Sequence, residues 1–163
     1  MAALYPVAGC KIYIGGQVVP KSTDFVAADF TSEVWEPIGG WTTMGSFGDT
    51  AQLITADVID EGRTKKLKGT RNAGSMANTF NTDAEDAGQA ACLAASNTVA
   101  SYAFKVELND KGDGVGATNS FRYFIGLVMS AAEQGGGANT PQTFNVTVEI
   151  NSNIVAVPAT PGT

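Results

Sequence analysis

Histidine is absent from this 163-residue sequence, and its absence removes several kinds of active site. Neither a Ser-His-Asp nor a Cys-His catalytic arrangement can form, and the usual general base near pH 7 is lacking. A zinc site made only of cysteines needs four thiolates, whereas this chain has two cysteines. No Walker A loop, GxSxG elbow or GxGxxG turn after a strand occurs. We therefore expect no catalytic, cofactor-binding or metal-binding residues.

Charged side chains are also scarce. They make up 16% of the chain, against about a quarter of a typical globular protein. The formal net charge is −6, opposite in sign to that of a protein that grips nucleic acid through Lys and Arg. A surface poor in charge suits extensive protein–protein contact, because interface cores are depleted in charge. A β-protein with a neutral surface would have the same composition.

Long apolar runs are missing as well. No stretch approaches the roughly 20 apolar residues that span a bilayer, so we expect no membrane insertion by this chain. Residues 1–6 lack the basic region and apolar core of a secretory signal. We therefore expect synthesis in the cytoplasm, where Cys10 and Cys92 stay reduced. A disulfide within or between chains stays open.

Two acidic segments have a functional alternative that the residues support weakly. Glu33 and Glu36 flank Trp35, as carboxylates do in a glycosidase cleft, but acidic residues on a strand more commonly face solvent. Residues 109–114 resemble a calcium loop by composition. Counted from Asp110, however, the twelfth position is Phe121 where that loop needs Glu, so a turn rich in Asp and Gly is predicted. We do not expect an enzyme.

Hydrophobic periodicity predicts a mainly β fold with one helix, in a single domain over residues 1–163. Strict apolar alternation indicates strands over 99–108, 121–129 and 144–150, each with one face on a core. Earlier strands are expected over 11–14, returning through a Gly15-Gly16 hairpin turn to Pro20, and over 30–38 and 51–60. Residues 63–80 have extended character. Strands with intervening loops and one helix predict a β-sandwich or barrel packed by that helix.

The helix is expected over residues 83–95. Thr82 stands three residues before Glu85, which is the spacing of a capping box, and Asn97 is a suitable stop. Small residues at helical spacing predict the face that lies on the sheet, formed by Ala87, Ala91 and Ala94.

Half of the ten basic residues gather in segment 63–71, namely Arg63, Lys65, Lys66, Lys68 and Arg71. A solvated strand and a subunit contact are equally good interpretations. A nucleic-acid-binding patch ranks third, because the segment contains no aromatic residue on which a base could stack. In an acidic chain, a concentrated basic stripe suits head-to-tail contact between copies.

Segment 39–48 places Trp41, Met44 and Phe47 among glycines. These side chains can fold back on the core of their own subunit, or they can dock into another subunit, where aromatics and Met are enriched. Both alternatives stay open. The second makes 39–48 a mobile assembly loop and the three side chains assembly contacts.

Several motifs in this order resemble the tail tube proteins of long-tailed phages, also called major tail proteins. They are Trp41-x-x-x-Gly45-x-Phe47-Gly48, Lys68-Gly69-Thr70-Arg71-Asn72-Ala73-Gly74, Asp83-x-x-Asp86-x-Gly88-Gln89, Tyr102-Ala103-Phe104-Lys105-Val106-x-x-Asn109-Asp110 and Phe124-Ile125-Gly126-Leu127-Val128-Met129-Ser130. The resemblance extends over residues 11–157. It implies a β-sandwich with one flanking helix and no catalytic residues.

The resemblance also implies a structural role in the virion. Copies of the chain would form hexameric rings that stack into the phage tail tube, a conduit for DNA delivery into the host cell. Implied partners are the tape measure protein in the lumen, other tail proteins at the tube ends, and DNA only in transit. Residues 1–10 would be an N-terminal arm and residues 158–163 a flexible tail. Alternatives are a tail terminator or baseplate hub, or a ligand-binding β-sandwich with Trp35 or Trp41 as its platform.

Overall fold

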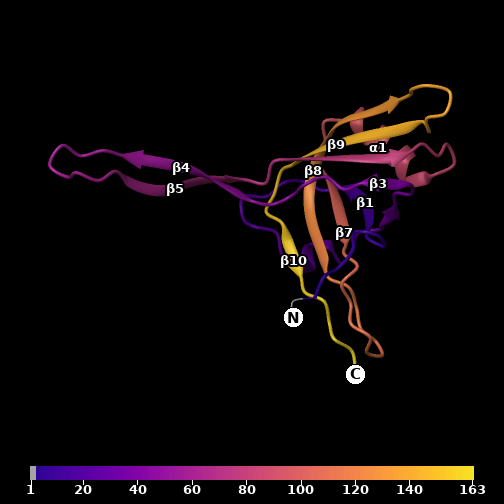
Figure 1. Ribbon diagram of the computed structural model, residues 1–163, viewed down its shortest axis with the longest axis horizontal. Helices are drawn as coiled ribbons and strands as arrows, with labels where there is room; N and C mark the ends of the chain where they lie inside the picture. Colours follow the sequence, from indigo (N-terminus) through magenta and orange to yellow (C-terminus); the bar gives the residue numbers. More distant parts are fainter. Residues whose placement is uncertain (1–2) are drawn as a thin grey trace.

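The computed structural model describes residues 3–163 and confirms a mainly β fold with one α-helix (Figure 1). The helices are η1, a 3-10 helix at Ala27–Phe30, and α1 at Ala87–Ser96. The strands are β1 (Lys11–Gln17), β2 (Glu36–Pro37), β3 (Trp41–Thr43), β4 (Thr50–Ala56), β5 (Lys65–Asn72), β6 (Ser75–Asn81), β7 (Tyr102–Glu107), β8 (Phe121–Gln134), β9 (Thr143–Ile150) and β10 (Val155–Val157).

One eight-stranded antiparallel sheet forms the body, and the long strand β8 joins its two halves. The strand order is β2-β1-β7-β8-β9-β6-β3, with β10 also paired to β8. Residues 121–126 of β8 pair with β7, while residues from Gly126 onward pair with β9. The register shifts between Val128 and Ser130, where a bulge bends the strand. Figure 1 shows the consequence, because β9 and β6 cross above β7, β8 and β10.

The main hydrophobic core lies between these two halves and is closed by α1. Phe104 and Phe124 stack at its centre with ring centroids 5.6 Å apart. The alternation predicted for residues 144–150 is confirmed, since Phe144, Val146, Val148 and Ile150 are all buried. Helix α1 contributes Cys92 and Ala95. The curled sheet therefore encloses its core as a sandwich does.

A second, smaller core covers the outer face of β7 and the first half of β8. Phe25 and Phe30, which come from η1 and the segment before it, pack there against Ala103 and Ile125. Strict alternation over 121–129 predicted one buried face. The middle of β8 is instead buried on both faces, because Phe124 belongs to the main core and Ile125 to the second.

Two early expectations were wrong. Strand β1 continues through Gly15-Gly16 to Gln17 and does not turn back as a hairpin. Gly15 is needed there because a Cβ would lie 2.9–3.2 Å from atoms of Glu33, Trp35 and Ala103. Segment 30–38 is not a strand apart from Glu36–Pro37, since Phe30 ends a 3-10 turn that carries its ring into the second core.

Helix α1 begins later than predicted and buries a different face. Its N-cap is Asp86, whose carboxylate accepts hydrogen bonds from the backbone N–H of Gly88 (2.8 Å) and Gln89 (3.2 Å), so the proposed Thr82–Glu85 capping box is wrong. The C-cap at Asn97 is confirmed. The buried residues are Gly88, Gln89, Cys92 and Ala95, whereas Ala87 and Ala94 are exposed and Ala91 is half-buried.

Gly88 sets this face, because it touches the segment before β3. A Cβ at this position would lie 2.7 Å from Ile38 Cα and closer still to the carbonyl oxygen of Pro37. We expect Gly88→Ala to lower the free energy of unfolding by about 1–3 kcal/mol, the usual cost of overpacking. Gly112→Ala, with nothing within 4 Å of its Cβ, is the control. Urea unfolding of both variants measures the difference, and equal stability would contradict this reading of the helix contact.

Both cysteines are free thiols, but Cys92 is buried whereas Cys10 is half-buried. Cys92 is 0% exposed. Burial, with the nearby Asp86 charge adding to it, raises the pKa of Cys92 to about 12. Because the pKa of Cys92 is higher in the folded than in the unfolded chain, its thiol contributes fully to the free energy of unfolding below about pH 9. That contribution is lost as the pH rises toward 12. The free energy of unfolding should therefore fall by about 2 kcal/mol between pH 8 and 10.5, because the thiol ionises in the unfolded chain and stays neutral in the folded one.

The comparison that isolates this effect is wild type against Cys92→Ala, because other groups titrate equally in both. Urea unfolding at pH 8 and 10.5 should show a smaller loss of unfolding free energy for Cys92→Ala than for wild type. Parallel losses in the two proteins would contradict the assignment.

Candidate assembly interface

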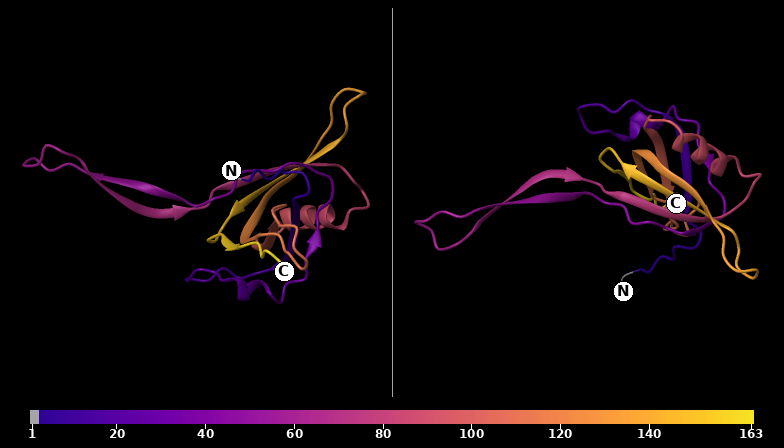
Figure 2. Two further views of the ribbon diagram at one scale, coloured as in Figure 1. Left: turned by 60° about the horizontal axis from the view of Figure 1, so that its bottom comes forward. Right: turned by 90° about the horizontal axis from the view of Figure 1, so that it is seen from above.

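Strands β4 and β5 form a hairpin that leaves the body of the subunit (Figures 1 and 2). They pair only with each other, as a separate two-stranded sheet. Every residue of both strands is exposed except Ala51 and Gly69, which are half-buried. A two-stranded hairpin without a covered hydrophobic face is at best marginally stable in water. This geometry suits an element that packs against another molecule.

The hairpin has two chemically different faces. Residues opposite one another in the ladder share a face, and the register pairs Ile54 with Leu67, Leu53 with Lys68, and Thr55 with Lys66. We call the side that carries Ile54 and Leu67 the apolar face. The opposite side carries Leu53, Lys66 and Lys68, and we call it the basic face. The Leu67 side chain is 67% exposed, so the apolar face is open to solvent in a single subunit.

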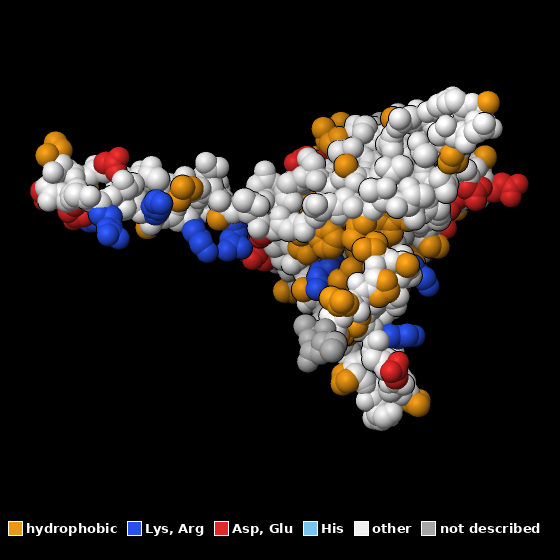
Figure 3. All heavy atoms as spheres, in the orientation of Figure 1, with side chains coloured by type: hydrophobic (Ala, Val, Ile, Leu, Met, Phe, Trp, Pro, Cys, Tyr) orange, Lys and Arg blue, Asp and Glu red, His pale blue; other side chains and the backbone are white. Residues whose placement is uncertain are grey.

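The five basic residues of segment 63–71 all lie on this hairpin or its tip, and they fall into two groups. Lys65 Nζ lies 2.8 Å from Glu61 Oε1, and Arg71 Nη1 lies 3.5 Å from Asp49 Oδ2. Arg63, Lys66 and Lys68 form no ion pair with any of residues 3–163. Figure 3 shows the basic side chains along one edge of the hairpin. Their charges are therefore available to an acidic partner.

Trp41, Met44 and Phe47 lie elsewhere, on the main core of their own subunit. The Trp41 ring stacks on Phe80 at 6.4 Å, and the Phe47 ring stacks on Phe124 at 6.3 Å. Residues 41–43 are strand β3, paired with β6, where a glycine-rich loop was expected. In the single subunit these side chains therefore pack on their own core, and their role as assembly contacts stays a prediction.

A buried amide holds this segment in place. Asn78 Oδ1 accepts hydrogen bonds from Trp41 Nε1 (3.2 Å) and from the backbone N–H of Gly45 (3.0 Å). Gly45 lies directly on β6, since a Cβ there would collide with the backbone of Ala77. The Trp-Gly-Phe spacing of the motif thus has a packing explanation.

Both terminal segments of the described chain are held by hydrogen bonds to loops of the body. In the N-terminal arm, Leu4, Tyr5 and Val7 are exposed, and Asn109 Nδ2 donates to Ala8 O at 2.8 Å. The C-terminal tail was expected to lack structure. It pairs instead with the loop before β8, through a Thr118–Thr160 bridge and two backbone hydrogen bonds between Val115 and Thr163.

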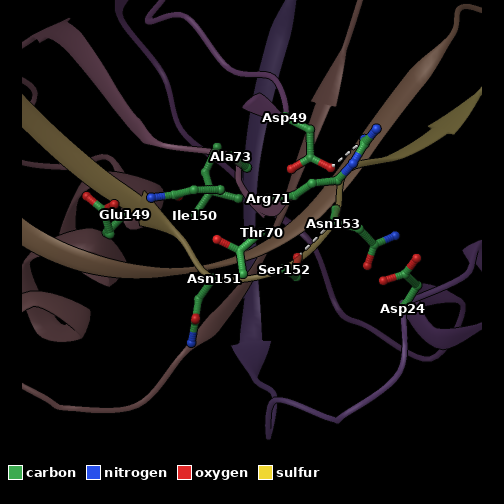
Figure 4. A pocket seen from close by; sticks show the side chains of 11 residues that line it. Asp24, Asp49, Thr70, Arg71, Ala73, Glu149, Ile150, Asn151, Ser152 and Asn153 are labelled. Carbon is green, nitrogen blue, oxygen red and sulfur yellow. Dashed lines mark hydrogen bonds and ion pairs between the residues drawn. The ribbon is translucent and has the colours of Figure 1, made fainter. Parts of the chain in front are cut away.

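A polar depression of about 780 Å³ lies where the hairpin meets the body (Figure 4). Its wall includes the Asp49–Arg71 ion pair and Glu149, which accepts a hydrogen bond from the Ser75 hydroxyl. Asp24 and Asn153 complete one side. The wall therefore carries the carboxylates of Asp24, Asp49 and Glu149 together with one cation, Arg71, which is paired with Asp49.

The two acidic segments considered from the sequence have structural roles. Glu33 Oε2 accepts the backbone N–H of Gly16 at 2.9 Å, which ties the segment before β2 to β1. Asp110 accepts the backbone N–H of Ser120 at 2.8 Å and its hydroxyl at 2.5 Å. Burial disfavours its charge, but these hydrogen bonds outweigh burial and lower the pKa of Asp110. Within residues 3–163, no group of three potential metal ligands comes together.

No helix in the described part of the chain, residues 3–163, has the length and apolar character to cross a membrane.

No family model matches this chain, and no curated protein matches it either.

Solved structures, in contrast, match it over nearly its whole length. A structure titled as the baseplate of the anti-feeding prophage matches with a TM-score of 0.70 and 8% identity, covering 97% of this chain and 98% of the other. The SPP1 tail tube matches at 0.64 and 14%, covering 94% and 80%. The sheath/tube terminator of an extracellular contractile injection system matches at 0.65 and 10%, covering 96% and 98%. This chain therefore has the tail tube fold.

Proposed function

We propose that this chain is a structural, non-enzymatic virion protein that polymerises as stacked hexameric rings into a phage tail tube, a conduit for DNA delivery into the host cell. The observation that carries the proposal is the β4–β5 hairpin, which stands clear of a body with the tail tube fold. Within residues 3–163, no element covers the exposed apolar and basic faces of this hairpin.

Self-assembly follows from the energetics of that hairpin. Burying Leu53, Ile54 or Leu67 against another copy contributes roughly 1.5–3 kcal/mol for each fully covered side chain. The contact repeats at every subunit, so a modest gain per copy becomes large in a ring. A surface on one copy that meets a different surface on the next gives rings when the rotation closes and filaments when it does not.

The other proposed partners are those that a tail tube would contact. They are the tape measure protein inside the lumen, other tail proteins at the two ends, and DNA in transit. The tube itself would be located in the tail of the virion, after synthesis of the chain in the host cytoplasm.

The lumen should be neutral or negative. Double-stranded DNA carries one negative charge per roughly 1.7 Å of axis, so a basic wall would retain it. With a net charge of −6 and half of its ten basic residues in segment 63–71, the chain can form such a wall if that segment faces a neighbour or the exterior. A cryo-EM map of assembled tubes tests this expectation, and several Lys or Arg side chains of that segment lining the channel would contradict it.

A second candidate is a tube terminator or a baseplate component. It is favoured by the titles of two matching structures, one a baseplate and one a sheath/tube terminator. A ligand-binding sandwich is less well supported. The Trp35 ring stacks on Phe30 and Trp41 on Phe80, so both indoles are engaged in the cores.

Negative-stain microscopy of the purified protein separates these candidates. Long hollow tubes are expected for a tube protein, and discrete rings that do not stack would favour the terminator or baseplate. Monomers that bind sugar and never assemble would contradict both.

A further inference from the structure

A groove with an acidic rim lies at the end of the body that is opposite the hairpin. It has a volume of about 170 Å³ and lies between the start of α1 and the β8–β9 hairpin. Its apolar residues are Ala84, Ala90, Leu93 and Phe144, of which Leu93 is 47% exposed. Its carboxylates are Asp83, Asp86 and Glu133. Figure 3 shows acidic side chains gathered at this end of the molecule.

These carboxylates lack cationic partners in their own subunit. Among residues 3–163, none of the three forms an ion pair. Asp86 is used as the N-cap of α1, and Asp83 accepts one backbone N–H from Glu85. The buried hydroxyl oxygen of Thr82, in the same wall, has no hydrogen-bond partner in the described chain. The groove thus combines uncompensated negative charge, a polar atom without a partner and an exposed leucine.

The basic face of the hairpin has the complementary chemistry. Lys66 and Lys68 are two residues apart on one strand, so they project from the same side about 7 Å apart. Leu53 lies opposite Lys68 in the ladder. Two cations beside a leucine match two carboxylates beside a leucine. The hairpin points away from the groove of its own subunit, so only another copy can bring the two surfaces together (Figure 1).

We infer that the basic face of the β4–β5 hairpin docks into the acidic groove of a second copy of this chain. Lys66 and Lys68 pair with Asp83 and Glu133 of that copy, and Leu53 covers its Leu93. The inference rests on the proposed self-assembly and assigns the two surfaces that meet. The polar depression at the hairpin base is a poorer acceptor, because its wall includes Arg71, which would repel the incoming lysines, and it offers no exposed leucine to cover.

Charge reversal on each surface tests this inference. The hairpin variant is Lys66→Glu with Lys68→Glu, and the groove variant is Asp83→Lys with Glu133→Lys. All four side chains are exposed, so both variants should fold, with a slightly lower melting temperature for the groove variant because Asp83 no longer accepts the backbone N–H of Glu85. Each variant alone should assemble at least tenfold more slowly by light scattering, because like charges then face one another. Lys11→Glu with Lys111→Glu, at two exposed positions outside both surfaces, makes the same charge change as the hairpin variant and is its control.

Mixing provides the decisive measurement. In an equimolar mixture, the reversed hairpin of one variant fits the reversed groove of the other, and the two unaltered surfaces fit as well. Alternating copies should therefore assemble at a rate close to that of wild type, and so should the variant with all four substitutions.

The outcomes distinguish this inference from the proposed function. Wild-type assembly together with normal assembly of either variant alone would overturn the inference and leave the proposed function intact. So would folded variants that assemble neither when mixed nor when combined in one chain. A wild-type protein that never assembles would overturn both.

Discussion

Replacing residues 51–71 by an Asn-Gly turn should leave a folded subunit that no longer assembles. Thr50 and Asn72 are paired across the base of the hairpin, so a two-residue turn can join them. Beyond this base, β4 and β5 pair only with each other, and neither core includes a residue from them. The truncation removes the Asp49–Arg71 ion pair, but an exposed pair contributes at most about 1 kcal/mol.

Two measurements check this prediction. Urea unfolding should give a stability within about 1 kcal/mol of wild type, while light scattering and negative stain should detect no rings or tubes. Normal assembly of the truncated chain would exclude the hairpin as an assembly element. An unfolded product would show that the hairpin supports the body.

Trp41→Ala with Phe47→Ala is expected to destabilise the subunit itself. Truncating a buried Trp or Phe costs about 3–5 kcal/mol, and these half-buried rings should each cost about half of that. Together they would remove about 3–5 kcal/mol from a total stability of roughly 5–15 kcal/mol. Loss of Trp41 also removes the indole N–H that Asn78 accepts, so a buried amide loses one of its two partners.

Chemical unfolding of the monomer measures this cost. Val34→Ala with Val99→Ala is the control, because these apolar side chains are 86% and 99% exposed and should change stability little. Trp41→Phe separates the two contributions of Trp41, since it keeps a ring on Phe80 and removes the hydrogen bond. If the double variant proved as stable as the control and yet failed to assemble, the side chains would have to act between subunits.

Much of the fold could be read from patterns that repeat along one element. Phe144, Val146, Val148 and Ile150 alternate, and all four are buried, because a strand with one face on a core needs apolar side chains at every second position. The clustering of basic residues over 63–71 likewise identified the segment that carries the hairpin's cations. These features depend on neighbours two to four residues apart, so they can be predicted from the sequence.

What the sequence could not supply depends on contacts between distant residues. Nothing near Trp41 and Phe47 in the sequence shows that their rings stack on Phe80 and Phe124, because those partners lie far along the chain. The helix face follows Gly88 and its contact with Pro37, so counting alanines chose the wrong side.

The sequence by itself determined the class of this protein: a β-rich, weakly charged chain without histidine, with half of its cations gathered in one segment. Tertiary structure alone decided that this segment stands clear of the body and that Asp83 and Glu133 share a groove 50 residues apart in sequence. The physical reason is that composition and periodicity report which side chains must be buried, whereas the partner that buries them is set by how the sheet curls at β8.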